Sequence, residues 1–429
     1  MMESAQPEPP TSPRPKLHEV IPPLVMGTAT FNTQYVPDPF ELPAASIVSR
    51  ALDLGVAAFD TSPYYGPSET ILGDALAHAT AARASYFLVT KAGRIGPDEF
   101  DYSAPWIRYS VYRSLARLRT PYLDLVYAHD VEFVSPAEVL AAVRELRRLR
   151  DDEGGVVRYV GISGYPVATL CALAEMVLRE TGEPLDAVLS YGHFTVQNTT
   201  LGRADGAMRR FADAGVDVVL NASMLGMGLL TTRGADAGPM AAWHPSPDGL
   251  RRACHDIAAV AAEAGETLEA VAIRWALENW SRDGAARGTT RASTGLPAGA
   301  RVGVSVMGIS NTAELEETCR VFNSVIDGLQ PPPPPPQQQQ PPDSGDAELA
   351  RRSRSSRDAR ARIEAVVEKM WTVLGAWKDY SWASPDPGFV NARRGADVGV
   401  TPDDGILTKK HELATTAVQV NVEEVAPAL

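Results

Sequence analysis

The sequence predicts a closed (β/α)8 barrel, in which eight parallel strands are each followed by a helix. First, short apolar or β-branched runs alternate eight times with amphipathic helical patterns between about residues 24 and 326. Second, the strand-like runs are continuously apolar, as expected of a parallel sheet that helices cover on its faces. Third, this span suits the roughly 250 residues or more that such barrels use. A doubly wound sheet is the alternative, but it normally opens with a glycine-rich turn after the first strand, and here that turn reads MGTATF.

The individual elements are assigned from their periodicity. Strand segments are short and rich in Val, Ile, Leu and aromatic residues, whereas helical segments repeat apolar residues every three or four positions. The predicted strands cover 24–27, 56–60, 86–91, 123–129, 157–163, 185–191, 216–223 and 302–308. The helical patterns cover 44–55, 68–79, 106–118, 136–150, 167–180, 203–215, a region that ends near 280, and 312–326.

Composition limits the classes of function. The chain has 429 residues, 45% of them hydrophobic and 22% charged, which is ordinary for a globular enzyme. Its net charge of -13 argues against a general binder of nucleic acid or anionic membranes. Three widely spaced cysteines without a CxxC pattern indicate neither a disulfide framework nor a metal site. With no signal peptide and no apolar run long enough to span a bilayer, we expect a cytosolic protein.

The domain organisation is that of one barrel with additions. We expect residues 1–19 to be disordered, a single barrel domain over 20–385, and a tail over 386–429. Insertions are expected at about 281–301, which is polar and rich in small residues, and at 328–360.

The second insertion holds a proline-glutamine tract at 331–342 and then an arginine-rich run, and neither has the composition to build a core. Binding of a protein partner by the proline tract stays open. After it, apolar residues recur at helical spacing and predict a final helix that docks on the barrel: Ile363, Val366, Val367, Met370, Leu374 and Trp377.

Three ionisable residues end consecutive predicted strands. Asp60, Lys91 and His129 each stand at the carboxyl end of a strand, the rim where barrels carry their active sites. Taken singly, a helix cap, a solvated lysine and a structural histidine are the simpler interpretations. Their common placement on one rim favours a single site.

With these residues in place, the chain resembles the aldo-keto reductase family. The family carries an Asp-Tyr-Lys-His tetrad with the tyrosine five positions after the aspartate, which in DTSPYYGPSE is Tyr65, while Tyr64 is expected to pack or to line the pocket. The segments WHPSP (243–247) and WKDYSWASP (377–385) resemble the branch of fungal D-arabinose 1-dehydrogenase and plant L-galactose dehydrogenase. The resemblance implies oxidation of an aldose at C1 to a lactone with a nicotinamide cofactor.

The chemistry suits these residue types. A hydride can leave carbon only if the hydroxyl proton leaves too, so a base is needed, and Tyr65 is the candidate. A free tyrosine titrates near 10, and we expect the Lys91 ammonium to lower that value. Asp60 would hold Lys91, and His129 would donate a hydrogen bond to the substrate oxygen.

The resemblance also places the cofactor and the substrate. In the cofactor region, Ala222 or Ser223 stands where the family has a tyrosine that stacks on the nicotinamide. Gly164 replaces the family's asparagine. Either Ser190 or Tyr191 occupies the position of a glutamine found in other branches. No Lys-Arg clamp for a 2'-phosphate is visible, because Gly308 and Glu314 stand near those positions, so NAD is favoured over NADP. Ser310 and Asn311 could equally cap the next helix. The expected cofactor contacts are Gly27, Thr28, Asp60, Ser163, Tyr191, Ser223, Leu225, Gly226, Gly228, Gly308, Ser310, Asn311 and Glu317, and the expected substrate contacts are Phe31, Tyr65, Trp106, His129, Trp243 and His244, with His193 a further candidate.

Two alternatives remain open. The first is an aldehyde or pyridoxal reductase on the same barrel. The second is a noncatalytic regulatory subunit that binds a nicotinamide nucleotide and a protein partner, as some family members do. Neither nucleic acid, membrane nor metal is an expected partner of any of these.

Overall fold

The protein is a closed eight-stranded parallel barrel. The computed structural model describes residues 14–204, 206–236, 238–291, 296–331 and 344–409. Each strand pairs with the next in sequence, and β1 pairs with β8 to close the barrel, so the predicted fold class is confirmed. The strands are β1 (Leu24–Gly27), β2 (Ala58–Asp60), β3 (Phe87–Ala92), β4 (Leu123–His129), β5 (Val157–Gly164), β6 (Ala187–Tyr191), β7 (Val218–Ala222) and β8 (Val304–Gly308).

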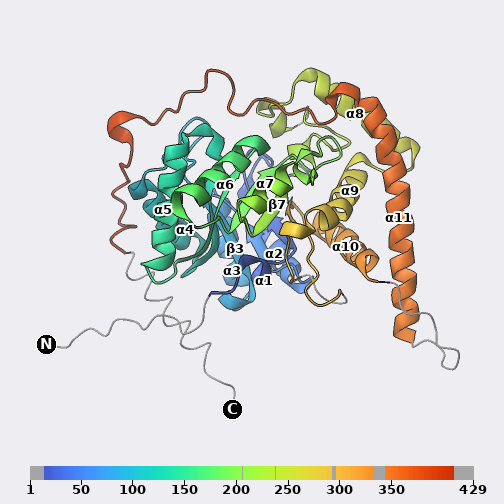
Figure 1. The fold of residues 1–429 in the computed structure, drawn as a ribbon, viewed down its shortest axis with the longest axis horizontal. Coiled ribbons are helices and arrows are strands. Elements are labelled where there is room, and N and C mark those ends of the chain that lie inside the picture. The colour runs from blue at the N-terminus through green and yellow to red at the C-terminus, as the bar shows by residue number, and fades with distance from the viewer. Residues whose placement is uncertain (1–13, 205, 237, 292–295, 332–343, 410–429) are drawn as a thin grey trace, which may run out of the picture.

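Helices surround the barrel (Figure 1). Several begin at a side-chain N-cap, such as Ser135, which forms a reciprocal capping box with Glu138 at the start of α5. The helices are α1 (Leu17–Val20), α2 (Ala44–Asp53), α3 (Ser68–His78), α4 (Ala104–Leu118), α5 (Pro136–Asp151), α6 (Val167–Thr181), α7 (Ala207–Asp213), α8 (Asp248–Glu263), α9 (Leu268–Asp283), α10 (Thr312–Leu329) and α11 (Ser344–Leu374).

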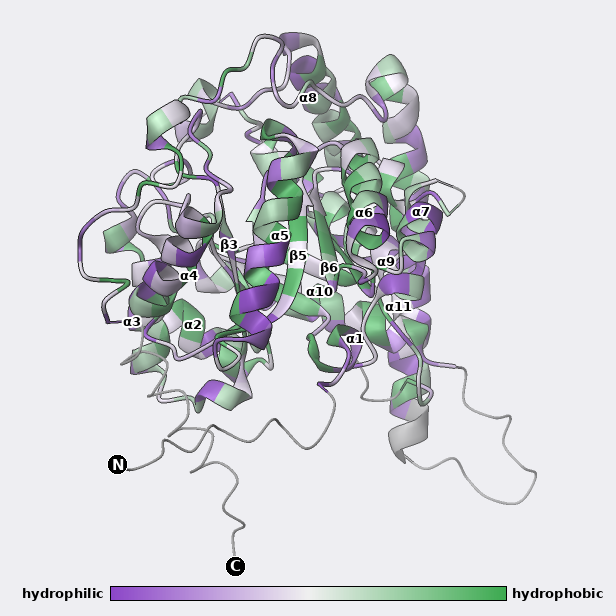
Figure 2. Cartoon of the chain, turned by 60° about the vertical axis from the view of Figure 1, so that its left-hand side comes forward, coloured by the Kyte–Doolittle hydropathy of each residue, from purple (hydrophilic) through white to green (hydrophobic). Residues whose placement is uncertain are grey.

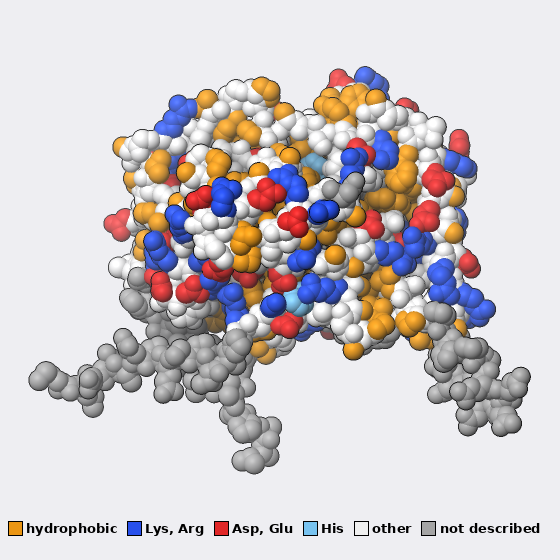
Figure 3. Space-filling model, in the orientation of Figure 1, with side chains coloured by type: hydrophobic (Ala, Val, Ile, Leu, Met, Phe, Trp, Pro, Cys, Tyr) orange, Lys and Arg blue, Asp and Glu red, His pale blue; other side chains and the backbone are white. Residues whose placement is uncertain are grey.

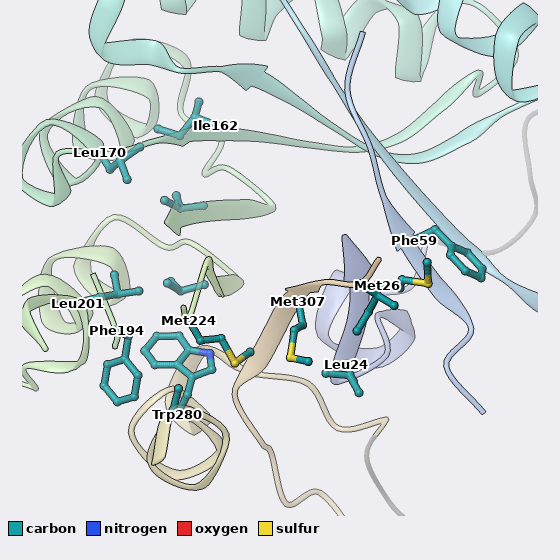
Figure 4. Packing of buried hydrophobic residues seen from close by; sticks show 14 of the residues in the cluster. Leu24, Met26, Phe59, Ile162, Leu170, Phe194, Leu201, Met224, Trp280 and Met307 are labelled. Carbon is teal, nitrogen blue, oxygen red and sulfur yellow. The ribbon is translucent and has the colours of Figure 1, made fainter. Parts of the chain in front are cut away.

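Two apolar layers hold the barrel together. Because side chains alternate along a strand, one set fills the interior, as with Val89 and Leu125, and the other packs under the helices. Figure 4 shows part of the outer layer, where the Trp280 and Phe194 rings lie 4.9 Å apart. In Figure 2 the strands β5 and β6 are mostly green, while α5 carries purple on the side toward the viewer. The hydropathy pattern therefore matches a buried sheet with amphipathic helices outside it.

Residues 14–19 are part of the described structure, which corrects the expectation of disorder for these six residues. In α1, Leu17 is fully buried with Ile21 in the interior cluster of the barrel. Nδ1 of the His18 imidazole is hydrogen-bonded to Oδ1 of Asp217 at 2.7 Å. This short segment cannot form a core of its own, and packing of Leu17 and Ile21 against the apolar interior of the barrel stabilises it.

Part of the segment 281–301, which was expected to be an insertion, belongs to regular structure. Its first residues belong to α9, and Thr289 forms a β-bridge with Val302. The buried Thr289 hydroxyl donates to the Ile21 carbonyl at 2.6 Å. This part of the chain therefore fastens α1 to the barrel, and residues 292–295 lie outside the described residues.

The carboxyl-terminal helix docks as predicted. In α11, which runs beside α9 and α10 (Figure 1), the five residues from Ile363 to Leu374 named above are buried and Trp377 is half-buried. The arginine-rich run, however, is also part of α11, and Ser353 and Ser356 in it are buried. The Arg274 guanidinium donates to the Ser356 hydroxyl at 2.9 Å, so small side chains allow the helix to approach closely. The expectation that this run takes no part in the packed structure is therefore wrong, whereas residues 332–342 of the proline-glutamine tract lie outside the described residues.

The segment after α11 returns to the barrel. Phe389 packs edge-on against Phe133, with ring centroids 4.9 Å apart, and the Asn391 side chain bonds to the Phe100 backbone in both directions. Arg393 forms an ion pair with the buried Asp101 at 2.7 Å. The predicted tail therefore belongs to the folded structure at least as far as these residues.

The surface carries mixed charge. On the face shown in Figure 3, blue and red side chains are interspersed without a large area of one sign. None of the helices in the described ranges is long and apolar enough to cross a membrane.

Candidate active site

The strand register brings the three rim residues together. Asp60 of β2 pairs with Val89 of β3, and Lys91 lies two residues farther along on the same face. On the next strand, His129 ends β4. After β2, the Tyr65 amide donates to the Ser62 carbonyl at 3.0 Å, a tight turn that returns Tyr65 over the barrel mouth. All four residues of the predicted tetrad line one cavity.

Lys91 and Asp60 form a buried ion pair. The Nζ of Lys91 lies 2.6 Å from Oδ1 of Asp60, and it also donates to the Thr61 carbonyl at 2.9 Å. Their side chains are 2% and 6% exposed, so solvent screens the pair little. Burial raises the pKa of Asp60, while the charge of Lys91 and its hydrogen bond act against that rise.

Tyr65 differs from the expectation in its protonation. The Lys91 Nζ lies 4.9 Å from the centroid of the Tyr65 ring, and the hydrogen bonds of Lys91 go to Asp60 and Thr61. Burial, followed by the negative charges of Asp60 and Asp130, raises the pKa of Tyr65 well above its usual value. The pKa of Tyr65 is therefore raised rather than lowered as expected, because burial and these two carboxylates outweigh the nearby cations. Tyr65 is a protonated phenol, the form that donates a proton.

His129 is a neutral imidazole. Burial lowers its pKa to about 3, although Asp130 acts in the opposite direction. Its Nε2 lies 3.5 Å from Oδ2 of Asp130, which is also paired with the Arg94 guanidinium. Burial opposes ionisation of Asp130, but His129 and Arg94 outweigh it and lower the pKa. A neutral histidine can give a hydrogen bond to a substrate oxygen without adding charge.

The cavity has room for a dinucleotide and a small substrate. Its volume is about 1650 Å³, and it extends from the barrel mouth to the start of α10. Of the predicted contacts beyond the tetrad, those that line it are Gly27, Ser163, Tyr191, Ser223, Leu225, Gly228, Trp243, Gly308, Ser310 and Glu317.

Three predicted cofactor contacts lie outside the cavity walls. The Thr28 hydroxyl is buried in a hydrogen bond with Ser68 at 2.8 Å. Gly226 is buried in the turn after β7. Asn311 caps α10 instead, because its side chain accepts from the Glu314 amide at 2.9 Å. The structure therefore places none of these three residues on the cavity wall, and Asn311 caps α10.

Three predicted substrate contacts also lie away from the cavity walls. Phe31 is fully buried in the core. Trp106 is 4% exposed in α4, where Arg393 lies 4.2 Å from its ring centroid. The Nε2 of His244 is hydrogen-bonded to the Gly226 carbonyl at 2.9 Å, so this histidine supports the loop after β7. Each of these side chains is occupied by packing that the sequence pattern did not reveal.

The register at β6 is also resolved. Tyr191 lines the cavity, whereas Ser190 is buried beside His193, at 3.4 Å from its Nδ1. His193 itself contacts Ser381 at 3.2 Å and is not a cavity wall. Tyr191 of β6 therefore supplies an aromatic ring to the cavity wall, whereas Ala222 and Ser223 after β7 supply none.

The residues present fit a nicotinamide dinucleotide. The loop after β7 has positive φ at Ser223 (56°), Met227 (56°) and Gly228 (93°), a curled backbone of the kind whose N–H groups form an anion-binding concavity. A Cβ at Gly228 would lie 2.4 Å from the Met240 sulfur, so a glycine keeps this turn open. Arg233, eleven residues after β7, also lines the cavity and supplies a cation for a pyrophosphate.

Sequence reasoning missed several wall residues. Arg94 and Asp130 line the cavity, and each follows a tetrad residue, Lys91 and His129, within three positions. This closeness in sequence was the signal that could have identified them. Trp382 comes from the segment after α11 and stacks on Tyr165 at 4.7 Å. Its position over the mouth depends on the path of a remote segment, so no local pattern identified it.

Glu132 explains one departure from the family pattern. A Cβ at Gly164 would lie 2.4 Å from Glu132 Oε2, so this carboxyl fills the space that an asparagine side chain would need. Glu132 Oε1 accepts from the Tyr165 amide at 3.0 Å and from the Ser384 hydroxyl at 2.9 Å. Burial, with the charge of Asp130, raises its pKa to about 8.

Comparison with known proteins agrees with this geometry. The profile of the Aldo/keto reductase family matches residues 23–329. The chain is 42% identical over 262 residues to D-arabinose 1-dehydrogenase of Saccharomyces cerevisiae, and the aligned region covers 60% of this chain and 76% of that protein. It is 34% identical over 239 residues to L-galactose dehydrogenase of Arabidopsis thaliana, with 55% and 70% covered. It is 30% identical over 265 residues to 6-dehydroglucose reductase of Novosphingobium aromaticivorans, with 55% and 83% covered.

The barrel and its rim of acid-base groups are those of an oxidoreductase. The chain belongs to the aldo-keto reductase family, whose members use nicotinamide cofactors.

Proposed function

We propose that the protein oxidises an aldose at C1 to the corresponding lactone, with NAD as hydride acceptor. The observation that carries the proposal is the convergence of Asp60, Tyr65, Lys91 and His129 on one cavity. The names of two relatives, a D-arabinose and an L-galactose dehydrogenase, support an aldose as substrate.

The balance of the reaction assigns the roles. The C1–H bond breaks and its electron pair leaves as hydride, which the nicotinamide accepts when bound. The C1 hydroxyl loses its proton to Tyr65, and the C1–O bond becomes the lactone carbonyl. His129 donates a hydrogen bond to the oxygen at which charge changes. Asp60 keeps Lys91 beside the tyrosine ring, where the ammonium stabilises the phenolate.

The protonated state of Tyr65 favours a second candidate, reduction of an aldehyde. A phenol with a raised pKa keeps its proton at neutral pH, so it is present in the protonated form that carbonyl reduction requires. For oxidation the same group must first lose its proton. We therefore expect the oxidation rate to rise with pH across the neutral and alkaline range, and the reduction rate to stay level until the pH approaches the raised pKa of Tyr65.

NAD is favoured over NADP by charge at the adenosine end of the cavity. Ser310 and Glu314 line that end, and the Ser310 amide and hydroxyl both donate to Glu314 Oε2 at 2.8 Å. The Glu314 carboxylate thus already occupies donors that a 2'-phosphate would use, and it would repel a phosphate dianion. Glu317 adds a second carboxylate to the wall.

A charge-removal pair tests this preference. Glu314→Gln should raise kcat/KM with NADP relative to NAD by roughly tenfold, or about 1.4 kcal/mol. Glu316→Gln on the same helix is the control, because Glu316 pairs with Arg50 at 2.8 Å and does not line the cavity. An unchanged ratio in Glu314→Gln would remove this basis for the NAD preference.

The activity is tested with Tyr65→Phe. Initial rates with NAD and NADP over D-arabinose, L-galactose, L-fucose and small aldehydes identify the substrate class. The variant should lose turnover by about 10² to 10⁴ while cofactor binding, measured by fluorescence titration, stays within about twofold. Undiminished turnover would contradict the role of Tyr65. Cofactor binding without turnover of any panel member, in the unmodified protein, would favour the regulatory subunit.

A further inference from the structure

Ser62 has a buried hydroxyl that the mechanism above does not use. It lies between Asp60 and Tyr65, is fully buried, and does not line the cavity. Its Oγ is 3.0 Å from Nδ1 of His129 and 3.1 Å from the backbone nitrogen of Tyr64. These two contacts connect the turn that carries Tyr65 to the His129 imidazole.

The direction of each hydrogen bond follows from the chemistry of the groups. The Tyr64 amide can only donate, so it uses one lone pair of the Ser62 oxygen. The Ser62 hydroxyl hydrogen then needs an acceptor, and the acceptor in contact among the described residues is Nδ1 of His129. The opposite arrangement, with a proton on Nδ1, would leave this hydrogen unpaired in a buried site, which is costly.

The other side of the ring leads to the same tautomer. Nε2 of His129 lies 3.5 Å from Oδ2 of Asp130, and the Arg94 guanidinium holds that carboxylate in place. A carboxylate only accepts, so it favours a proton on Nε2. The imidazole is neutral over the physiological range, so one nitrogen alone carries the proton.

We infer that Ser62 is a positioning residue that fixes His129 as its Nε2–H tautomer and so directs an N–H donor at the reacting oxygen. The catalytic part of this inference rests on the proposed function, whereas the tautomer itself does not. Without Ser62, Nδ1 loses its donor and the proton redistributes between the two nitrogens. A fraction of molecules would then present a lone pair, rather than a donor, to the substrate oxygen.

The tautomer can be read directly in the full-length protein without substrate. Histidine labelled with ¹⁵N gives separate long-range ¹H–¹⁵N patterns for the two neutral tautomers, and His129→Gln identifies the His129 signals among those of the seven histidines. The unmodified protein should show an unprotonated Nδ1 and a protonated Nε2. A protonated Nδ1 would overturn the inference whatever the enzyme's substrate proves to be.

Variants connect the tautomer to catalysis. Ser62→Ala should shift the His129 signals toward the Nδ1–H pattern and lower kcat by about tenfold, with little change in cofactor binding. Ser62→Thr, which keeps a hydroxyl, should restore both the signals and most of the rate.

Ser68→Ala is the matched control, because Ser68 is a buried hydroxyl that bonds to Thr28 and Thr61 at 2.8 and 3.0 Å rather than to His129. Unchanged tautomer and rate in Ser62→Ala would refute the assignment, as would an equal loss of rate in Ser68→Ala. If Ser62→Ala does not fold, the spectrum of the unmodified protein still decides. A confirmed tautomer with no aldose oxidation would contradict the proposed function and leave this inference standing.

Discussion

The Lys91–Asp60 ion pair permits a quantitative prediction. Oδ1 of Asp60 accepts from Lys91 at 2.6 Å, and Oδ2 is buried without a hydrogen-bond partner among the described residues. Lys91→Met would therefore leave a carboxyl in a buried site with neither a counter-charge nor its main donor. Removing one partner of such a pair costs about 3 to 5 kcal/mol, so the thermal midpoint should fall by on the order of 10 °C. Activity should be lost as well.

The pH dependence of this loss has a definite sign. Burial already raises the pKa of folded Asp60 above its unfolded value, and removing Lys91 raises it further. The folded variant therefore binds a proton that the unfolded chain releases, and its stability falls as pH rises toward that folded pKa. Urea denaturation should show a larger deficit for Lys91→Met at pH 8 than at pH 5.

A double-mutant cycle separates this effect from simple loss of packing. Asp60→Asn with Lys91→Met should cost at least about 2 kcal/mol less than the sum of the single changes, because neither charge is left alone. Arg179→Met is the surface control, since Arg179 and Glu180 pair at 3.0 Å with side chains 66% and 44% exposed. Single changes that cost under about 1 kcal/mol, or costs that simply add, would refute the reasoning.

Three further predictions concern stability and substrate binding. Because the pKa of folded Glu132 is raised to about 8, the folded state keeps a proton that the unfolded state loses, so the free energy of unfolding should fall between about pH 5 and 8. Glu132→Gln should flatten this pH dependence of the urea midpoint. An unchanged pH dependence would assign it to another group. Met370→Ala, at a fully buried position in α11, should cost about 2 to 5 kcal/mol by thermal or urea unfolding, and a cost near zero would mean that α11 is not part of the cooperative fold. Trp382→Ala should raise KM for the sugar several-fold with little change in cofactor affinity, because Trp382 lines the cavity and stacks on Tyr165. Equal losses of sugar affinity and cofactor affinity would indicate instead that the segment around Trp382 has lost its structure.

The barrel could be predicted because its information is local. Each strand is an apolar run and each helix an apolar stripe, so eight repeats of that pattern specify the architecture. Asp60, Lys91 and His129 were identified for the same reason, since residues at the ends of parallel strands share one rim. Tyr65 was identified through the resemblance to the aldo-keto reductase family, whose tyrosine stands five positions after the aspartate.

The walls of the site could not be predicted in the same way. Trp382 reaches the mouth through a segment that follows α11 in sequence, and its contact with Tyr165 joins parts of the chain more than 200 residues apart. Trp106 looked equally suitable as an aromatic wall, yet α4 turns it into the protein interior. Composition also misled at the arginine-rich run, because packing of Ser356 against Arg274 stabilises a helix there.

The sequence by itself determined the barrel, its order of strands and the three ionisable residues at its rim, because hydropathy and strand ends are properties of neighbouring residues. Only the tertiary structure decided the protonation of Tyr65 and the hydrogen-bonding partners of His129, because these depend on burial and on charges that arrive from other strands. Electrostatic energy in a buried site is set by distances of a few ångströms between residues remote in sequence, and those distances exist only once the chain has folded.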